Sequence, residues 1–218
     1  MLISGPVEDS LLRLLPCCGV AAGASKRSSA QGRQFNSSGG SAHIPRFRSA
    51  AVGGRAVRRT ARSGCKQAPV LVVLCGPSHS GKTTLAEQLG DRFQVINSDA
   101  IRKRLTGKSG PLGREEKVWG TFEAMKLKAL QEGRSVVLDA CHMSRRARWH
   151  SLQGPNAGHR KVCVLFDLPL AVVLARCREA GRLPPEEVER MWRAFQAIKP
   201  TPAELRREGY DEVHVVME

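Results

Sequence analysis

The chain has 218 residues, 41% of them hydrophobic, and its 35 Lys and Arg residues outnumber 20 acidic residues to give a net charge of +15. A chain of this size buries one full core, so we expect one α/β domain with an appendage. No apolar run approaches the roughly 20 residues that span a bilayer, which argues against a membrane protein. The seven cysteines show no C-x-x-C spacing, which disfavours a structural metal site or a disulfide framework.

The first 67 residues form a basic arm. They contain 11 basic and two acidic residues, a net charge of +9, against 24 and 18 in the remainder, a net of +6. Residues 10–67 contain no acid and are rich in Ser, Ala, Gly and Arg, so we expect disorder over 1–67 and a folded domain over 68–218. The arm is either a transit peptide for a mitochondrion or chloroplast, or a basic arm with no targeting function, which would leave the protein cytoplasmic or nuclear. A third alternative is a tail that binds nucleic acid through its positive charge.

A phosphate-binding motif follows the arm. Residues 76–83, GPSHSGKT, have the spacing G-x-x-x-x-G-K-[ST], between an apolar run at 70–75 that predicts a buried strand and a predicted helix at 81–91. In such a loop, backbone N–H groups point at phosphate oxygens, Lys82 reaches the β- and γ-phosphates and the Thr83 hydroxyl holds Mg²⁺. The sequence therefore predicts a nucleoside-triphosphate site formed by Gly76, Ser78, His79, Ser80, Gly81, Lys82, Thr83 and Thr84.

The chain after this loop alternates between predicted strands and helices. The further strands are expected at 94–98, 135–139, 161–166 and 212–216, and the further helices at 99–105, 115–132, 144–152, 169–180 and 185–198. This alternation predicts an α/β fold, a P-loop NTPase-type parallel sheet of about five strands with helices on both faces. The Gly- and Pro-containing stretch 107–113 is expected to be a mobile loop. Ligands of such sheets bind beyond the carboxyl ends of the strands.

Two carboxylates lie where strands are expected to end. Asp99 and Arg102 are three residues apart and share a helix face, so Asp99 could accept a proton from an attacking hydroxyl while Arg102 holds a phosphate of the acceptor. Alternatively, Asp99 only caps the helix and Arg102 is a solvated surface charge. Asp139 either orients Mg²⁺ or positions the acceptor, or it only starts a turn.

Basic residues cluster at two later positions. The first group, near the end of a predicted helix before Pro184, is Arg176, Arg178 and Arg182. Arg178 and Arg182 would face together, and the group is either part of a lid that stabilises a transferred phosphoryl group or a complement of the helix dipole. A second group lines either an acceptor groove or a solvated helix face: Arg145, Arg146 and Arg148. The large aromatic residues are expected to fill the core: Trp119, Trp149 and Trp192.

Taken together, these segments resemble the polynucleotide 5′-hydroxyl kinase branch of the P-loop kinases, the group typified by the phage polynucleotide kinase. The matching segments are 76–84, 97–102, 136–139, the lid region up to Pro184, and parts of 195–213, so the resemblance covers about 69–216. The resemblance implies that Lys82 and Thr83 bind ATP and Mg²⁺. It also implies that Asp99 is the general base and that Arg102 binds the 3′-phosphate of the acceptor. The arginine of the lid would be Arg178 or Arg182.

The resemblance therefore implies ATP-dependent phosphorylation of a hydroxyl, first of all the 5′-OH of DNA or RNA. The same scaffold also hosts kinases of small alcohols such as gluconate, shikimate or sugar nucleotides. A third alternative is an ATP-binding regulatory module with weak ATPase activity. Because the chain has no D-x-D phosphatase signature and no evident ligase lysine motif, a role in nucleic-acid repair would be that of the kinase module alone.

Overall fold

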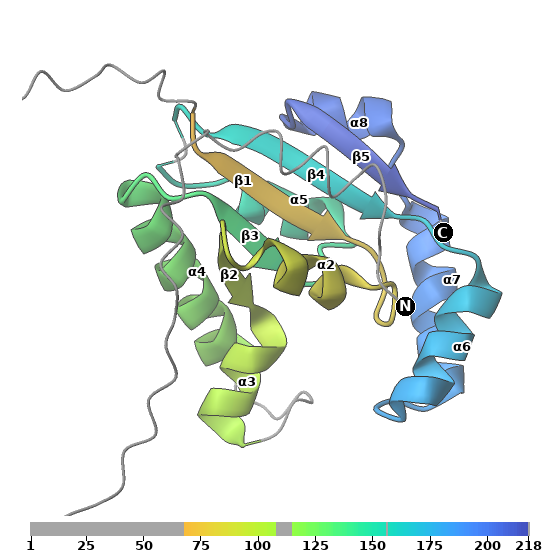
Figure 1. Ribbon diagram of the computed structural model, residues 1–218. Coiled ribbons are helices and arrows are strands. Elements are labelled where there is room, and N and C mark those ends of the chain that lie inside the picture. Colours follow the sequence, from red (N-terminus) through yellow and green to blue (C-terminus); the bar gives the residue numbers. More distant parts are fainter. Residues whose placement is uncertain (1–67, 108–114, 156, 218) are drawn as a thin grey trace, which may run out of the picture. The chain divides into compact units, whose positions relative to one another are not determined.

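A computed structural model describes residues 68–107, 115–155 and 157–217. The predicted basic arm and residues 108–113 of the predicted mobile loop lie outside the described residues. One parallel five-stranded sheet has the strand order β2-β3-β1-β4-β5 (Figure 1), which confirms the predicted fold class. The strands, whose ends lie within one residue of the prediction, are β1 (Val70–Cys75), β2 (Gln94–Asn97), β3 (Val136–Asp139), β4 (Arg160–Phe166) and β5 (Glu212–Val216).

Strand β1 lies at the centre of the sheet. Its six residues Val-Leu-Val-Val-Leu-Cys are all buried with no exposed surface, because β3 and β4 flank it and helices cover both of its faces. A continuous apolar run is the sequence pattern of a strand that is buried on both faces. The loop that follows Cys75 is therefore placed in the middle of the carboxyl edge of the sheet, between the ends of β3 and β4.

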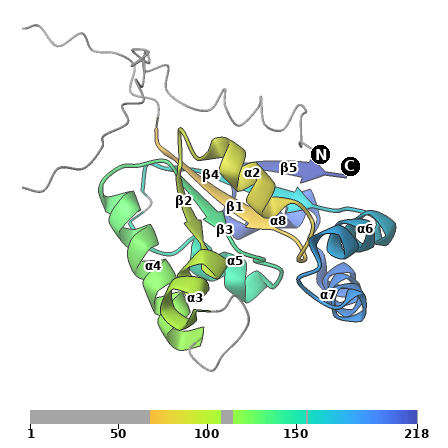
Figure 2. The same cartoon turned by 60° about the horizontal axis from the view of Figure 1, so that its bottom comes forward.

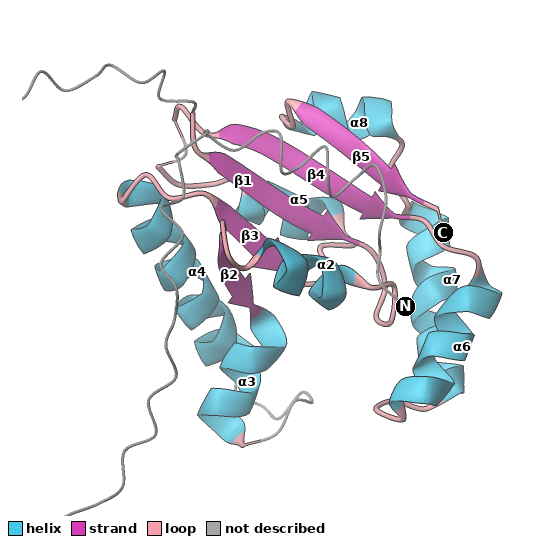
Figure 3. Ribbon diagram, viewed as in Figure 1, coloured by secondary structure: helices cyan, strands magenta, loops and turns pink. Residues whose placement is uncertain are grey.

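Helices pack on both faces of the sheet, as predicted (Figures 2 and 3). One face packs against Leu85 of α2 and Val173 of α6, and the other against Phe122 of α4 and Leu205 of α8. The helices of the described residues are α2 (Lys82–Leu89), α3 (Ser98–Thr106), α4 (Glu115–Gln131), α5 (Arg145–Ser151), α6 (Leu170–Ala180), α7 (Pro185–Ile198) and α8 (Pro202–Glu208). In the described ranges, no helix combines the length and the apolar content that a bilayer crossing requires.

Helix α8 is an element that the sequence interpretation missed. It begins with a capping box in which the Thr201 hydroxyl accepts from the Glu204 N–H at 3.2 Å and the Glu204 carboxylate accepts from the Thr201 N–H at 2.8 Å. Its seven residues are too few for an apolar periodicity to stand out, although the Thr-Pro-Ala-Glu start signal is present in the sequence.

Two of the three tryptophans lie at the surface. Trp192 packs against the core and its indole N–H donates to the Leu168 carbonyl oxygen at 2.8 Å, as expected for a packing residue. Trp119 and Trp149 are 42% and 56% exposed, so the prediction that they fill the core is wrong. Size and aromatic character alone did not reveal which helix face each residue would occupy.

A buried ion pair joins α5 to α8. The Arg148 guanidinium is 2% exposed and donates to both carboxylate oxygens of Glu208 at 2.7 and 2.8 Å, and Nη1 donates to the Met143 carbonyl oxygen. Arg148 therefore lines neither an acceptor groove nor a solvated helix face, whereas Arg145 and Arg146 are exposed.

The replacement Glu208→Ala is expected to lower the free energy of unfolding by about 3 kcal/mol, because the buried Arg148 guanidinium would lose its counterion. Equilibrium urea unfolding measures this loss. The matched control is Glu189→Ala, which removes an exposed partner of Arg193 and is expected to cost less than about 1 kcal/mol. Equal losses for the two variants would contradict the structural role of the Arg148–Glu208 pair.

Candidate functional site

The loop between β1 and α2 has the backbone of a phosphate cradle. Gly76 is required at its start because a Cβ there would lie 2.8 Å from the Phe166 Cβ, and the Gly76 N–H donates to the Cys141 carbonyl oxygen at 2.9 Å. Gly81, with φ of 96°, is the N-cap of α2 and brings no capping side chain, and the first turn of α2 has no acidic residue. The first N–H groups of α2 therefore remain available to an anion.

Lys82 lies over this cradle. Its Nζ donates to the Pro77 carbonyl oxygen at 2.5 Å and to Ser80 Oγ at 3.3 Å, and its exposed fraction is 7%. Within the described part of the chain no carboxylate forms an ion pair with it. A buried ammonium group held only by neutral oxygen atoms fits a phosphate ligand.

The other predicted loop residues surround Lys82. Ser80 is buried, Ser78 and Thr84 are half-buried, and Thr83 is exposed at the start of α2. His79 has a left-handed backbone, with φ of 61°. Burial lowers the pKa of His79, and the positive charges of Arg182 and Lys82 lower it further. The neutral form of the imidazole is therefore favoured, because a protonated ring would be repelled by these two cations.

Asp139 and Asn97 lie at the ends of the neighbouring strands β3 and β2, where the parallel register pairs them directly. The Asn97 side-chain amide donates to Asp139 Oδ2 at 2.5 Å, and Thr83 forms a side-chain hydrogen bond with the same carboxyl group. Burial raises the pKa of Asp139, while the bonds from Thr83 and Asn97 and the charge of Lys82 act against this shift. Asp139 therefore does more than start a turn: it connects β2, β3 and the phosphate loop.

These oxygen atoms fit Mg²⁺. A hydroxyl from Thr83 and a carboxylate from Asp139 are the hard ligands that this ion prefers, and Mg²⁺ is commonly held by one or two such groups together with substrate phosphates. Among the described residues no group of three or more His, Cys, Asp or Glu side chains could hold a metal ion by itself. A bound Mg²⁺ would take its remaining ligands from water molecules or from the phosphate oxygen atoms of a nucleotide.

Asp99 and Arg102 meet on α3, as their spacing predicts. Arg102 Nη1 donates to Asp99 Oδ1 at 2.5 Å, and the guanidinium also donates to both oxygens of Glu115 at 2.9 and 3.0 Å. The side chain of Arg102 is only 11% exposed, which contradicts a solvated surface charge, whereas that of Asp99 is 69% exposed. The N-cap of α3 is Asn97, whose Oδ1 accepts from the Ala100 N–H at 2.7 Å, so Asp99 is not the capping residue.

The Asp99–Arg102 pair and the phosphate loop are neighbours at the carboxyl edge of the sheet. The negative charge of Asp99 contributes to the raised pKa of Asp139, which itself contacts Thr83. On the opposite side of the loop, Arg176 of α6 donates to the Ser80 carbonyl oxygen at 3.0 Å, and Arg182 lies near enough to lower the pKa of His79. Arg178 is exposed in the last turn of α6.

Asn97 and Glu115 had no role in the sequence interpretation, and Arg176 was placed only in the basic group before Pro184, without a contact to the phosphate loop. Asn97 could have been found, since an Asn two residues before the predicted start of a helix is a candidate N-cap. Glu115 and Arg176 could not, because their partners lie 13 and 96 residues away along the chain. Only the packing of α4 and α6 brings these side chains to the site.

A family model described as an AAA domain, AAA_33, matches residues 71–198, which include the phosphate loop, the Asp99–Arg102 pair and Asp139. The chain belongs to the AAA_33 family. This assignment confirms the P-loop kinase-like part of the sequence interpretation. No curated protein sequence matches the chain.

Several solved structures are similar to this AAA domain. One is a chain of the Pnkp1/Rnl/Hen1 RNA repair complex, with 22% identity and a TM-score of 0.54 over 64% of this chain and 48% of that one, so the chain spans about half of that protein. Others are a putative kinase from Chloroflexus aurantiacus, with 18% identity and a TM-score of 0.49 over 69% and 85% of the two chains, and a gluconokinase from Sinorhizobium meliloti, with 21% identity and a TM-score of 0.45 over 69% and 83%. At 22% identity, the likeness to the chain of the RNA repair complex shows a common fold and nothing finer.

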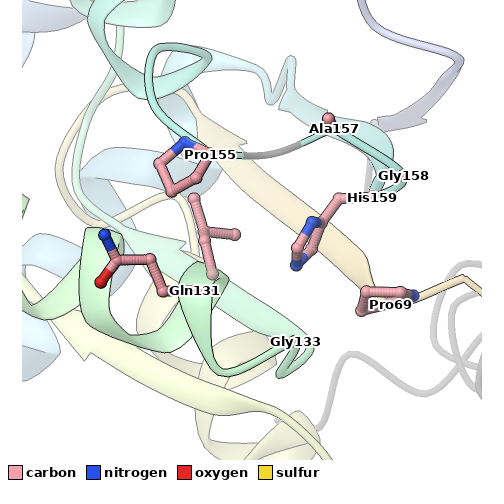
Figure 4. Close-up of a pocket in the computed structure, with 8 residues that line it drawn as sticks. Pro69, Gln131, Gly133, Pro155, Ala157, Gly158 and His159 are labelled. Carbon is pink, nitrogen blue, oxygen red and sulfur yellow. The ribbon is translucent and has the colours of Figure 1, made fainter.

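A separate cavity of about 520 Å³ lies at the other end of the AAA domain's sheet (Figure 4). Pro69 and His159, which line it, precede β1 and β4, so it opens at the amino ends of the strands rather than at the phosphate loop. None of the predicted site residues lines this cavity. The candidate site is therefore defined by the side chains at the carboxyl edge.

The imidazole of His142 forms part of the wall beneath the phosphate loop of the AAA domain. Its Nδ1 lies 2.9 Å from the Leu74 carbonyl oxygen. Burial, with smaller contributions from Lys82 and Lys126, lowers the pKa of His142 to about 4 even though hydrogen bonds to the Leu74 and Ala140 carbonyl groups act in the opposite direction. The folded protein therefore holds His142 in its neutral form.

This pKa predicts a loss of stability in acid. A folded-state pKa of about 4, below the ordinary value of 6.5, gives stability that is fully present above pH 6.5 and is lost as the pH falls toward 4. Between pH 7.5 and 5 the free energy of unfolding is expected to fall by about 2 kcal/mol through His142. Urea unfolding of the native protein and of His142→Gln at both values measures this change, and an identical pH dependence in the two proteins would contradict it.

Proposed function

We propose that this protein is an ATP-dependent phosphotransferase whose acceptor is a hydroxyl group, namely the 5′-OH of a polynucleotide. The observation that carries the proposal is the position of Asp99: an exposed carboxylate, held by Arg102, next to a phosphate loop with a buried lysine. A protein that only binds and releases a nucleotide has no need for a carboxylate in the acceptor position. The similarity to a chain of the RNA repair complex is a similarity of fold, so the proposed acceptor is argued from Asp99 and Arg102.

The nucleotide side of the reaction rests on the phosphate loop. The N–H groups of the loop and of the first turn of α2 would bind phosphate oxygens, and Lys82 would exchange the Pro77 carbonyl oxygen for the β- and γ-phosphates. Thr83 and Asp139 are the residues that would hold Mg²⁺, directly or through water. The ion, when bound, supplies positive charge that stabilises the transferred phosphoryl group.

The acceptor side rests on Asp99. Its carboxylate would take the proton of the hydroxyl group as the oxygen atom of that group attacks the γ-phosphorus, so that the bond to the β-phosphate oxygen breaks and ADP leaves. Arg102 would keep this carboxylate in place. A phosphate of the acceptor would have to compete with Glu115 for Arg102, because both Glu115 oxygens already bind the guanidinium. The role that we assign to Arg102 is thus first to position Asp99.

The negative charge that develops on the transferred phosphoryl group would be stabilised by cations on the side opposite Lys82. Arg178 and Arg182, at and just beyond the end of α6, are our candidates for this role. Arg182 is the better placed of the two, because its charge acts on His79 within the phosphate loop.

The acceptor is tested by incubating the full chain with labelled ATP and Mg²⁺ together with a 5′-OH oligonucleotide and, separately, with gluconate, shikimate and other small alcohols. We expect label on the oligonucleotide, and none when Lys82→Ala, which should keep its fold, replaces the native protein. Labelled gluconate or shikimate without labelled oligonucleotide would assign the protein to the small-molecule kinases. ATP hydrolysis with no labelled acceptor would favour the regulatory module.

Replacing the proposed base gives a second prediction. Asp99→Asn keeps the size and one acceptor oxygen but loses the basic carboxylate, so turnover is expected to fall about 100-fold or more with little change in the KM for ATP. Steady-state kinetics with the best acceptor measures both quantities. Asp91→Asn, in the exposed turn before β2, is the matched control and should retain native turnover. Native turnover in Asp99→Asn would show that Asp99 is not the base.

A further inference from the structure

The indole of Trp119 is an exposed aromatic surface at the acceptor side. Trp119 lies in the second turn of α4, is 42% exposed, and packs edge-to-face on Phe122, with ring centroids 5.5 Å apart and an interplanar angle of 65°. Its side chain also hydrogen-bonds to the Glu115 carboxylate. An indole held in this way keeps one orientation while part of its surface remains open to solvent.

Two sets of contacts connect this indole to the candidate site. The first runs through Glu115, which accepts from both Trp119 and Arg102, and Arg102 in turn holds Asp99. The second runs through Phe122, whose ring lies 6.2 Å from that of His142, the residue beneath the phosphate loop. The indole therefore lies at the same edge of the sheet as the proposed base, one carboxylate and one guanidinium away from it.

We propose that Trp119 is the surface on which the terminal base of the acceptor polynucleotide stacks, an inference that rests on the proposed function. A nucleoside whose 5′-OH is at Asp99 carries its base within a few ångströms, and a preorganised aromatic ring is the simplest partner for any base because every base has a π-face. Stacking of this kind is tolerant of sequence. The residue would thus select for a nucleotide end over a small alcohol without selecting among bases.

The expected effect lies in acceptor binding. Because stacking on an aromatic side chain contributes to the binding of each base, Trp119→Ala should raise the KM for a 5′-OH oligonucleotide by about tenfold while the KM for ATP stays unchanged. Trp119→Phe, which retains an aromatic face but cannot bond to Glu115, should keep most of the acceptor affinity. Trp149→Ala removes the other exposed tryptophan, on α5, and should leave the KM for the oligonucleotide as it is.

An acceptor without its terminal base separates stacking from an indirect effect through Glu115. With an oligonucleotide whose 5′-terminal nucleotide is abasic, the native protein should already show the raised KM, and Trp119→Ala should raise it no further. An equal effect of Trp119→Ala on both acceptors would show that the indole acts only by positioning Glu115 and Arg102, and would overturn the proposal. An unchanged KM in Trp119→Ala would overturn it as well.

Failure of the proposed function gives a different result. If the native protein labels no 5′-OH oligonucleotide, the assigned acceptor is wrong and the stacking proposal falls with it. If the native protein labels normal and abasic oligonucleotides with the same KM, the proposed function stands and only the stacking surface is rejected. Binding of MgATP by Trp119→Ala with native affinity serves as the check that this variant is folded.

Discussion

The side chain of Asn97 holds the two halves of the candidate site together. Its amide N–H₂ donates to the Asp139 carboxylate on the phosphate side, and its carbonyl oxygen caps α3, the helix that carries Asp99 and Arg102. The parallel register of β2 and β3 makes this possible, because it places Asn97 directly beside Asp139. One residue at a strand end thus fixes where α3 begins relative to Asp139, the residue that contacts Thr83.

The layer behind the sheet is built to be rigid. Lys126 of α4 has no exposed surface, and its ammonium group is bound by Glu123 at 2.7 Å and by the carbonyl oxygen atoms of His150 and Ser151. The Arg148–Glu208 pair joins α5 to α8 in the same layer. Buried cations with complete sets of partners allow few alternative arrangements.

Local patterns in the sequence were enough to predict the strands, most of the helices and the phosphate loop. The apolar run before Gly76 and the fixed spacing from Gly76 to Thr83 depend on neighbours within a few residues, so they could be read without knowing the fold. The contacts of Arg102 with Glu115 and of Arg148 with Glu208 could not, because helix packing rather than spacing brings these residues together. The prediction that Trp119 and Trp149 are buried was wrong for a related reason. Whether each side chain faces the core depends on which side of α4 or α5 packs against the sheet, and the sequence alone does not show this.

The bond from Arg176 to the Ser80 carbonyl oxygen ties a distant helix to the peptide that enters α2. Because a peptide unit is planar and trans, the direction of the Ser80 C=O also sets the direction of the Gly81 N–H. A shift of α6 that is too large for the Arg176 side chain to absorb must therefore either break this bond or turn the Gly81 N–H along with it. The direction of the Gly81 N–H therefore depends on the position of α6, although Arg176 lies 96 residues after Ser80 in the sequence.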